Sequence, residues 1–198
     1  MTLLLATTNR DKIREIQSLL SNAPVQLVGL GDVAPAAEPE ETGATFEDNA
    51  RLKARYYAAH SGLRAVAEDS GLVVDGLDGE PGVRSARYLG PDASYPERFA
   101  AIFKGLSEHP DRPRTARFVC AVAVADGDRI VFETTGTVEG VIAEKPAGSH
   151  GFGYDPIFHG PAYGATLAEV SEEAKLAVAH RGRAFRKLAA WLEATRYS

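Results

Sequence analysis

The chain has 198 residues, 44% of them hydrophobic, and a formal net charge of −5 at pH 7. This length and composition predict a single domain over residues 1–198, with no apolar run long enough to span a membrane. The negative charge argues against a nucleic acid as partner, whereas a small anion held by a few local cations is compatible with it.

The N-terminus and the cysteine content bear on the compartment. Residues Met1–Ala6 lack a basic leader and are too short for a signal peptide, so they predict a first strand. The single cysteine, Cys120, cannot form an internal disulfide and lies in an apolar run, so we expect a buried core residue rather than a nucleophile. No Cys/His cluster indicates zinc. These features favour a cytoplasmic protein.

The first part of the chain predicts alternating strands and helices. Strands are expected at 3–6 and 25–30, a helix after Asn9, a surface loop over 32–43 and a second helix that begins at Thr45. The apolar residues at helical spacing are Ile13, Ile16 and Leu20 in the first helix, and Phe46, Ala50, Ala54 and Tyr57 in the second.

Two adjacent carboxylates, Glu68 and Asp69, end the next apolar run, 65–67. Ser70-Gly71 predicts a turn, followed by another apolar run. Carboxylates at the end of a buried strand are costly unless something needs their charge, and a hydrated magnesium ion takes one or two of them. An exposed junction between strand and turn, where Asp and Ser are common, is the alternative.

The second part predicts more strands and a helical tail. Ser94 and Glu97 form a capping box that opens a helix, and Asp126-Gly127 is a hairpin signal between strands 117–125 and 129–135. Residues 138–143 are compatible with a further strand of this meander. The tail from Ser171 is expected to be helical. A mixed sheet flanked by helices indicates an α/β or α+β architecture.

Two segments in the first part could bind a triphosphate and its metal. Residues Thr7, Thr8, Asn9, Arg10, Asp11 and Lys12 lie between the first strand and the first helix, where free N–H groups and a positive dipole suit phosphate. The glycines of a P-loop are absent, and ordinary capping by Thr8 or Asn9 is the alternative. Glu40 and Glu41 could complete a metal site that Lys53 faces, or belong to a solvated acidic loop.

Two later segments could bind a base. The stretch 148–158 is rich in glycine, so backbone can approach a ligand closely, and Phe152 and Tyr154 offer ring faces for stacking. Its alternative is a glycine-rich turn with aromatic core residues. Lys175 with His180-Arg181 could hold phosphate and a base edge, or form a basic exposed helix face.

Six motifs run through the chain in order: Thr-Thr-Asn-x-x-Lys, Glu-Glu-Thr-Gly-x-Thr-Phe-x-x-Asn-Ala-x-x-Lys-Ala, Asp-Ser-Gly-Leu-x-Val-Asp, Pro-Gly-Val-x-Ser-Ala-Arg-Tyr, Gly-Phe-Gly-Tyr-Asp-Pro-Ile-Phe and Lys-x-x-x-x-His-Arg. With them the chain closely resembles the non-canonical purine nucleoside triphosphate pyrophosphatases, also called the inosine/xanthosine triphosphate pyrophosphatase family, over almost its full length. The resemblance implies an elongated, two-lobed α/β fold with the active-site cleft between the lobes, and usually a homodimer.

The same resemblance implies roles for individual residues. Asp69 is expected at a solvent-accessible cleft as general base and Mg²⁺ ligand, with Glu40 or Glu41 sharing the metal. The residues implied for the triphosphate are Thr7, Thr8, Asn9, Arg10, Asp11, Lys12 and Ser70, with Lys53 and Lys175 nearby. Those implied for the base are Phe152, Gly153, Tyr154, Asp155, His180 and Arg181.

The activity implied is Mg²⁺-dependent hydrolysis of inosine, deoxyinosine and xanthosine triphosphates (ITP, dITP and XTP) to monophosphate and pyrophosphate. It would remove deaminated purines before they enter nucleic acid. One alternative is a nucleotide-sensing protein without catalysis, although a pure binder needs no general base. The other is a pyrophosphatase for different modified nucleotides, such as modified pyrimidines.

Overall fold

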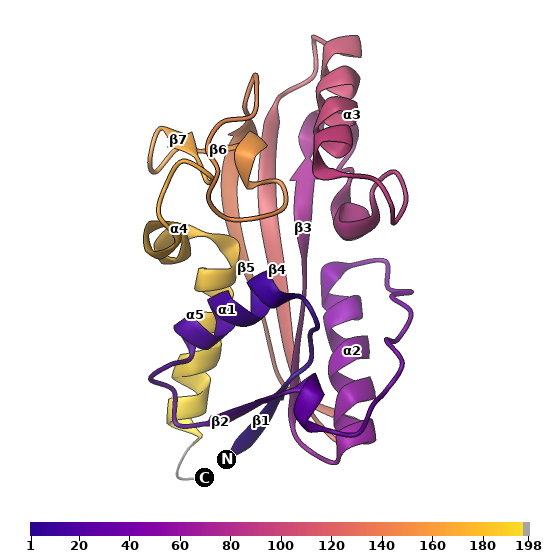
Figure 1. The fold of residues 1–198 in the computed structure, drawn as a ribbon, viewed down its shortest axis with the longest axis vertical. Coiled ribbons are helices and arrows are strands. Elements are labelled where there is room, and N and C mark those ends of the chain that lie inside the picture. Colours follow the sequence, from indigo (N-terminus) through magenta and orange to yellow (C-terminus); the bar gives the residue numbers. More distant parts are fainter. Residues whose placement is uncertain (196–198) are drawn as a thin grey trace. The chain divides into compact units, whose positions relative to one another are not determined.

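The structure, a computed structural model, describes residues 1–195. Its strands form one seven-stranded sheet in the order β2-β1-β3-β4-β5-β6-β7 (Figure 1). The strands are β1 (Thr2–Leu5), β2 (Gln26–Gly29), β3 (Ala65–Val74), β4 (Thr115–Asp126), β5 (Arg129–Ile142), β6 (Phe158–Gly160) and β7 (Ala165–Thr166). β1 pairs in parallel with β2 and β3, whereas β6 pairs antiparallel with β5 and β7. The predicted mixed sheet is therefore confirmed.

Helices flank the sheet, so the predicted α/β class is also confirmed. The helices are α1 (Arg10–Leu19), α2 (Phe46–Ser61), α3 (Tyr95–Glu108), α4 (Glu172–Val178) and α5 (His180–Ala194). None of the described helices is both long enough and apolar enough to cross a membrane.

The predicted helix starts are confirmed by side chains that cap them. Asn9 Oδ1 accepts the N–H groups of Asp11 and Lys12 at the start of α1, at 3.0 and 3.1 Å. Thr45 caps α2 in the same way, and Ser94 forms the predicted capping box at the start of α3. These caps satisfy N–H groups that a helix leaves without partners in its first turn.

The chain divides into two compact units. The first contains Met1–Asp69, Cys120–Gly136 and the C-terminal segment from His180, and the second contains Ser70–Val119 and Thr137–Ala179. Strands β3, β4 and β5 therefore contribute residues to both units. The predicted cleft between two lobes stays a prediction.

In the first unit, α1 and α5 lie side by side on one face of the strands and α2 lies on the other (Figure 1). Leu3 of β1 and Val66 of β3 pack in one buried cluster with Ile16 of α1 and Phe185 of α5. Cys120 is buried in this cluster, as predicted. The apolar stripe of α2, from Phe46 to Tyr57, is also buried.

The second unit has its own core. Leu72 of β3 and Phe118 of β4 pack with Ile102 of α3 and with Phe158 of β6. The aromatic rings of Phe118 and Phe158 lie 4.6 Å apart between centroids. Each unit therefore buries its own apolar cluster.

Two predicted boundaries are wrong. Ser70-Gly71 does not form a turn, because β3 continues from Ala65 to Val74, and Leu72 and Val74 beyond it are fully buried. The tail is not one helix: Ala179, with an extended ψ of 162°, separates α4 from α5. No glycine or proline marks this break. The possible strand at 138–143 proves to be the second half of the long strand β5.

Candidate functional site

β3 presents two adjacent carboxylates to opposite faces of the sheet. Consecutive residues of a strand point to opposite sides. Glu68 meets Lys12 of α1 and Arg181 of α5, whereas Asp69 meets Lys53 of α2. The two acids that stand together in the sequence therefore belong to two different clusters of charged groups.

In the Asp69 cluster, one ammonium bridges two carboxylates. Lys53 Nζ lies 2.6 Å from Glu41 Oε1 and 3.3 Å from Asp69 Oδ1. Asn49 Nδ2 donates to Asp69 Oδ2 at 3.0 Å, and Gly43 N–H donates to Asn49 Oδ1 at 2.8 Å, which ties the acidic loop to α2. Asp69 is only 5% exposed, so the expectation that it lies open to solvent is wrong for this structure.

Burial sets the protonation behaviour of this cluster. Burial raises the pKa of Asp69, and the negative charge of Glu41 adds to this rise, so the attraction of Lys53 does not cancel it. Burial also opposes the charge on Lys53, but Asp69 and Glu41 outweigh it and raise the pKa of the ammonium. A carboxylate with a raised pKa accepts a proton more readily, which suits a general base.

We predict that the Asp69 carboxyl of the metal-free protein titrates above the usual value of 3.8. Lys53→Met should raise this pKa further because a positive neighbour is lost, and Glu41→Gln should lower it because a negative neighbour is lost. Because folding raises this pKa, protonation of Asp69 stabilises the folded state. This stabilisation is fully present below pH 3.8 and is lost as the pH rises through the folded-state pKa. Carbon-13 NMR of the Asp69 carboxyl measures the three values. Shifts of the same sign in both variants would contradict the assignment.

The two acidic residues of the loop lie in different surroundings. Glu41 is half-buried and reaches Lys53, whereas Glu40 is exposed. Among residues 1–195, no group of three or more His, Cys, Asp or Glu is placed to hold a metal. A magnesium ion needs only one or two carboxylates and completes its shell with water and phosphate. The pair Asp69 and Glu41, whose oxygens already converge on one cation, fits this requirement.

The Glu68 cluster joins four elements. Glu68 Oε1 lies 2.6 Å from Lys12 Nζ, and Cys120 Sγ donates to Glu68 Oε2 at 3.0 Å. Arg181 donates to Glu15 of α1 at 2.6 Å and more distantly to Glu68 at 3.4 Å. Burial would raise the pKa of Glu68, but the charges of Arg181 and Lys12 outweigh it and hold this pKa well below its usual range.

The start of α5 is held close to β5. His180 and Arg181 are the first two residues of α5, and both are buried. A Cβ on Gly136 would lie 2.2 Å from the His180 carbonyl oxygen and 2.6 Å from the Ala184 nitrogen. Only glycine therefore allows the backbone of β5 to lie this close to the turn that carries His180 and Arg181.

Gly136→Ala should lower the free energy of unfolding by about 1–3 kcal/mol, because the added methyl group meets backbone atoms that cannot rotate away. Gly31→Ala is the control, since a Cβ at Gly31 would meet nothing within 4 Å. The control should change stability by less than about 0.5 kcal/mol. Urea titration of both variants measures the difference, and equal stabilities would contradict the close approach.

The segment between β1 and α1 is mostly a capping loop in this structure. Thr8, Asn9 and Arg10 are exposed, and Thr7 Oγ1 accepts the Asn9 N–H at 3.2 Å. Of the two alternatives for the cap, Asn9 is confirmed. Lys12 Nζ alone of these residues is shown to reach the Glu68 cluster, so the phosphate role of the others stays a prediction.

The glycine-rich stretch belongs to the second unit and surrounds a buried ion pair. Lys175 Nζ lies 2.6 Å from Asp155 Oδ2, and each side chain is 2% exposed. Phe152 N–H donates to the same Asp155 oxygen at 2.9 Å, and the Lys175 ammonium lies 4.7 Å from the centre of the Phe152 ring. Gly153 has a positive φ of 67° in this turn.

Tyr154 lies in the core of the second unit. It is 3% exposed, its ring packs edge-on against Tyr95, and its hydroxyl donates to the Ser85 carbonyl at 2.8 Å. This position matches the structural alternative for the stretch, whereas the half-buried Phe152 keeps the better position for stacking. The role of Tyr154 in base stacking stays a prediction.

Three residues that sequence reasoning did not assign join these clusters: Glu15, Asn49 and Cys120. Asn49 is part of the second motif, but no role was assigned to it there. Its place in that motif is the signal that could have identified it as a site residue. Glu15 follows Lys12 by three positions on α1 and has no local signal of burial. Cys120 was expected only as apolar filler, but its thiol donates to Glu68.

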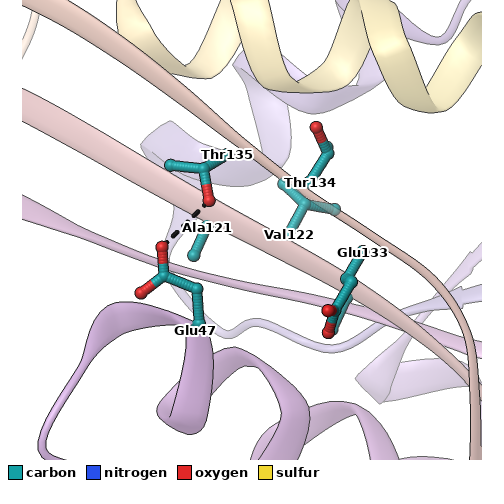
Figure 2. A pocket seen from close by; sticks show the side chains of 7 residues that line it. Glu47, Ala121, Val122, Glu133, Thr134 and Thr135 are labelled. Carbon is teal, nitrogen blue, oxygen red and sulfur yellow. Dashed lines mark hydrogen bonds between the residues drawn. The ribbon is translucent and has the colours of Figure 1, made fainter.

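A pocket of about 160 Å³ lies in the first unit, between the start of α2 and strands β4 and β5 (Figure 2). It is lined by Glu47, Ala121, Val122, Ala123, Glu133, Thr134 and Thr135. Thr135 Oγ1 donates to Glu47 at 3.0 Å across it. Pockets for drug-sized ligands usually have volumes of about 300–1,000 Å³, so we do not assign a nucleotide to this one.

Comparison with known proteins gives one consistent result. The model of the Ham1 family matches residues 3–191. The dITP/XTP pyrophosphatase of Geobacter sulfurreducens is 48% identical over 184 residues, which cover 92% of each chain. That of Exiguobacterium sibiricum is 43% identical over 192 residues, which cover 97% of each chain.

Solved structures agree. A HAM1 protein from Coxiella burnetii matches with a TM-score of 0.92 and 37% identity, covering 98% of this chain and 100% of that one. The dITP/XTP pyrophosphatase from Mycobacterium abscessus matches with a TM-score of 0.76 and 43% identity, covering 96% and 97%. The match over nearly the whole chain confirms the resemblance seen in the sequence motifs, and the chain is a member of the Ham1 family.

Proposed function

We propose that this chain hydrolyses ITP, dITP and XTP to the nucleoside monophosphate and pyrophosphate, and so cleanses the nucleotide pool. The observation that carries the proposal is Asp69, a buried carboxylate of raised pKa that Lys53 and Asn49 hold in place, in a chain of the Ham1 family. Relatives that match over more than nine-tenths of the chain are named dITP/XTP pyrophosphatases, which supports the substrate class.

In the proposed reaction, Asp69 takes a proton from the attacking water as general base. The water oxygen forms a new bond to phosphorus, and the bond between the α- and β-phosphoryl groups breaks, so pyrophosphate separates from the monophosphate. Lys12, Lys53 and Lys175 stabilise the negative charge that develops on the phosphates. The triphosphate is positioned by residues 7–11, at the junction of β1 and α1, and by Ser70.

We propose that Asp69 and Glu41, rather than the exposed Glu40, hold a Mg²⁺ ion. Oxygen donors of this kind suit magnesium, and Lys53 already shows that both carboxylates reach one cation. When bound, the ion neutralises phosphate charge and orients the triphosphate.

For the base, we propose that His180 and Arg181 donate to a 6-oxo group and that Asp155 accepts an N–H, beside Phe152, Gly153 and Tyr154. Adenine carries an amino donor and a bare nitrogen at these positions, so both protein groups would face like partners. Each unpaired polar group costs about 1–3 kcal/mol, so inosine forms should be favoured over adenosine forms about a hundredfold.

The test is purified protein with magnesium and a panel of nucleoside triphosphates, with pyrophosphate and orthophosphate measured separately. Pyrophosphate and monophosphate should appear in equal amounts, and chelation should abolish the activity. Orthophosphate with diphosphate would contradict the reaction. Binding without turnover would indicate a nucleotide-sensing protein. Turnover of modified pyrimidine nucleotides alone would indicate a pyrophosphatase for different modified nucleotides.

We further propose that residues 1–198 act as a single domain, that two copies form a homodimer, and that the protein works in the cytoplasm without nucleic acid or membrane partners. The family model that spans almost the whole chain supports the first point, and the net charge of −5 is compatible with the absence of a nucleic-acid partner. Sedimentation velocity at micromolar concentration tests the homodimer, and a single monomeric species would contradict it.

A further inference from the structure

The Asn49 side chain links the two segments that carry Asp69 and Glu41. Asn49 lies near the start of α2 and is 0% exposed. Its Nδ2 donates to Asp69 Oδ2 at 3.0 Å, and its Oδ1 accepts the Gly43 N–H at 2.8 Å. Gly43 follows Glu41 by two positions in the acidic loop. One buried amide therefore holds β3 at Asp69 and the loop backbone close to Glu41.

The chemistry of its two partners fixes the orientation of this amide. An asparagine side chain has an oxygen that accepts and a nitrogen that donates. The ionised Asp69 carboxylate only accepts, and the Gly43 N–H only donates. A flipped Asn49 amide would set oxygen against oxygen and N–H against N–H, which is costly in a buried place. The amide of Asn49 is therefore matched at both ends.

Gly43 gives independent evidence that the loop lies very close to α2. A Cβ on Gly43 would lie 2.6 Å from Asn49 Oδ1, 2.7 Å from Asp48 Cβ and 2.9 Å from the Asn49 backbone nitrogen. The backbone nitrogen belongs to the helix and cannot rotate away. Any side chain at position 43 would therefore push the loop away from Asn49.

Lys53 also contacts both carboxylates, but it does so as a cation. Its Nζ lies 2.6 Å from Glu41 Oε1 and 3.3 Å from Asp69 Oδ1. An ammonium repels a divalent cation and competes with it for these two oxygens. Asn49 is neutral, and it contacts the other Asp69 oxygen, Oδ2. It can therefore hold the two segments while a divalent cation takes the oxygens that now meet Lys53.

We propose that Asn49 is a positioning residue that holds Asp69 and the Glu41 loop in the arrangement that a two-carboxylate Mg²⁺ site needs, without touching the metal or the substrate. The inference rests on the proposed function, which gives Asp69 and Glu41 to the metal. Residues that hydrogen-bond to metal ligands fix the orientation of those ligands, and their replacement usually costs about 10–100-fold in metal affinity or activity.

The first test uses Asn49→Leu, which keeps the branching of the side chain and removes both hydrogen bonds. Mn²⁺ takes the same oxygen ligands as Mg²⁺, and electron paramagnetic resonance measures the free ion. Titration of the nucleotide-free protein with Mn²⁺ gives the Kd, which should rise at least about tenfold in Asn49→Leu. The Mg²⁺ concentration for half-maximal turnover of dITP should rise by the same factor. A loss of folded protein alone lowers the maximal rate but leaves this concentration unchanged.

The second test breaks the link from the loop side and decides the proposal should Asn49→Leu fail to fold. Gly43→Ala leaves every polar side chain of the site in place, but its methyl group displaces the loop that carries Glu41. The Kd of Mn²⁺ should again rise about tenfold. Gly31→Ala is the matched control, because a Cβ there meets nothing within 4 Å, and Asn22→Ala removes an exposed amide. Both controls should stay within about twofold of wild type.

The outcomes separate this proposal from the proposed function. An unchanged Kd of Mn²⁺ in Asn49→Leu would overturn the role of Asn49, and an unchanged Kd in Gly43→Ala would overturn the link to the loop. An equal loss in either control would also overturn the proposal. Absence of Mn²⁺ binding by wild type would refute the metal site and the role of Asn49 with it. Absence of dITP turnover by wild type would refute the proposed function, while the Mn²⁺ affinities of the variants still decide the role of Asn49.

Discussion

Asp69→Asn should lower turnover at least ~100-fold, the lower range for loss of a general base. The amide has nearly the same shape as the carboxylate, but it cannot accept a proton from water at neutral pH. Its oxygen can still accept the hydrogen bond from Asn49, and Lys53 keeps its 2.6 Å contact with Glu41. The loss should therefore appear in kcat rather than in the positions of the neighbouring groups.

The same substitution should not lower the free energy of unfolding. Folding raises the pKa of Asp69, so the charged form is disfavoured in the folded state, and a neutral amide removes this cost. Asp126→Asn is the control, because Asp126 forms an exposed ion pair with Arg64 at 2.9 Å. We expect near-normal turnover from the control. Near-normal turnover in Asp69→Asn would refute the mechanism, and an unfolded Asp69→Asn protein would refute the stability argument.

Lys175→Met should lower the free energy of unfolding by about 3–5 kcal/mol, the usual cost of removing one partner of a buried ion pair. Asp155 is 2% exposed and loses an ammonium that lies 2.6 Å away, so its charge becomes poorly compensated in the core of the second unit. Denaturant titration followed by circular dichroism measures the effect.

The double variant Lys175→Met with Asp155→Asn should recover much of this loss. The asparagine oxygen can still accept the Phe152 N–H, and no charge remains buried between the two positions. Lys104→Met is the control, since Lys104 pairs with Glu108 on the exposed surface of α3 at 3.7 Å, and it should cost less than about 1 kcal/mol. A double variant no more stable than Lys175→Met would contradict the account of an uncompensated charge.

Interactions over a few residues could be predicted from the sequence. The caps at Asn9, Thr45 and Ser94 each satisfy N–H groups two or three positions away, so their residue types and spacing were sufficient. The motif order was sufficient for the family, which the matches over nearly the whole chain confirm. Asp69 and Lys53 were also expected near one of the two loop acids, Glu40 or Glu41, and the structure places Glu41 there. The expected solvent exposure of Asp69 was wrong.

Contacts between distant segments were decided only by the tertiary structure. Arg181 meets Glu15 across 166 positions and Cys120 meets Glu68 across 52, and no local spacing encodes either contact. The continuation of β3 through Ser70-Gly71 depends on burial of Leu72 and Val74, which overrides the preference of the dipeptide for a turn. Because side chains alternate along a strand, this continuation places Glu68 and Asp69 on opposite faces of the sheet. The sequence by itself therefore determined the family and the candidate acids, whereas strand pairing decided which cations each acid meets.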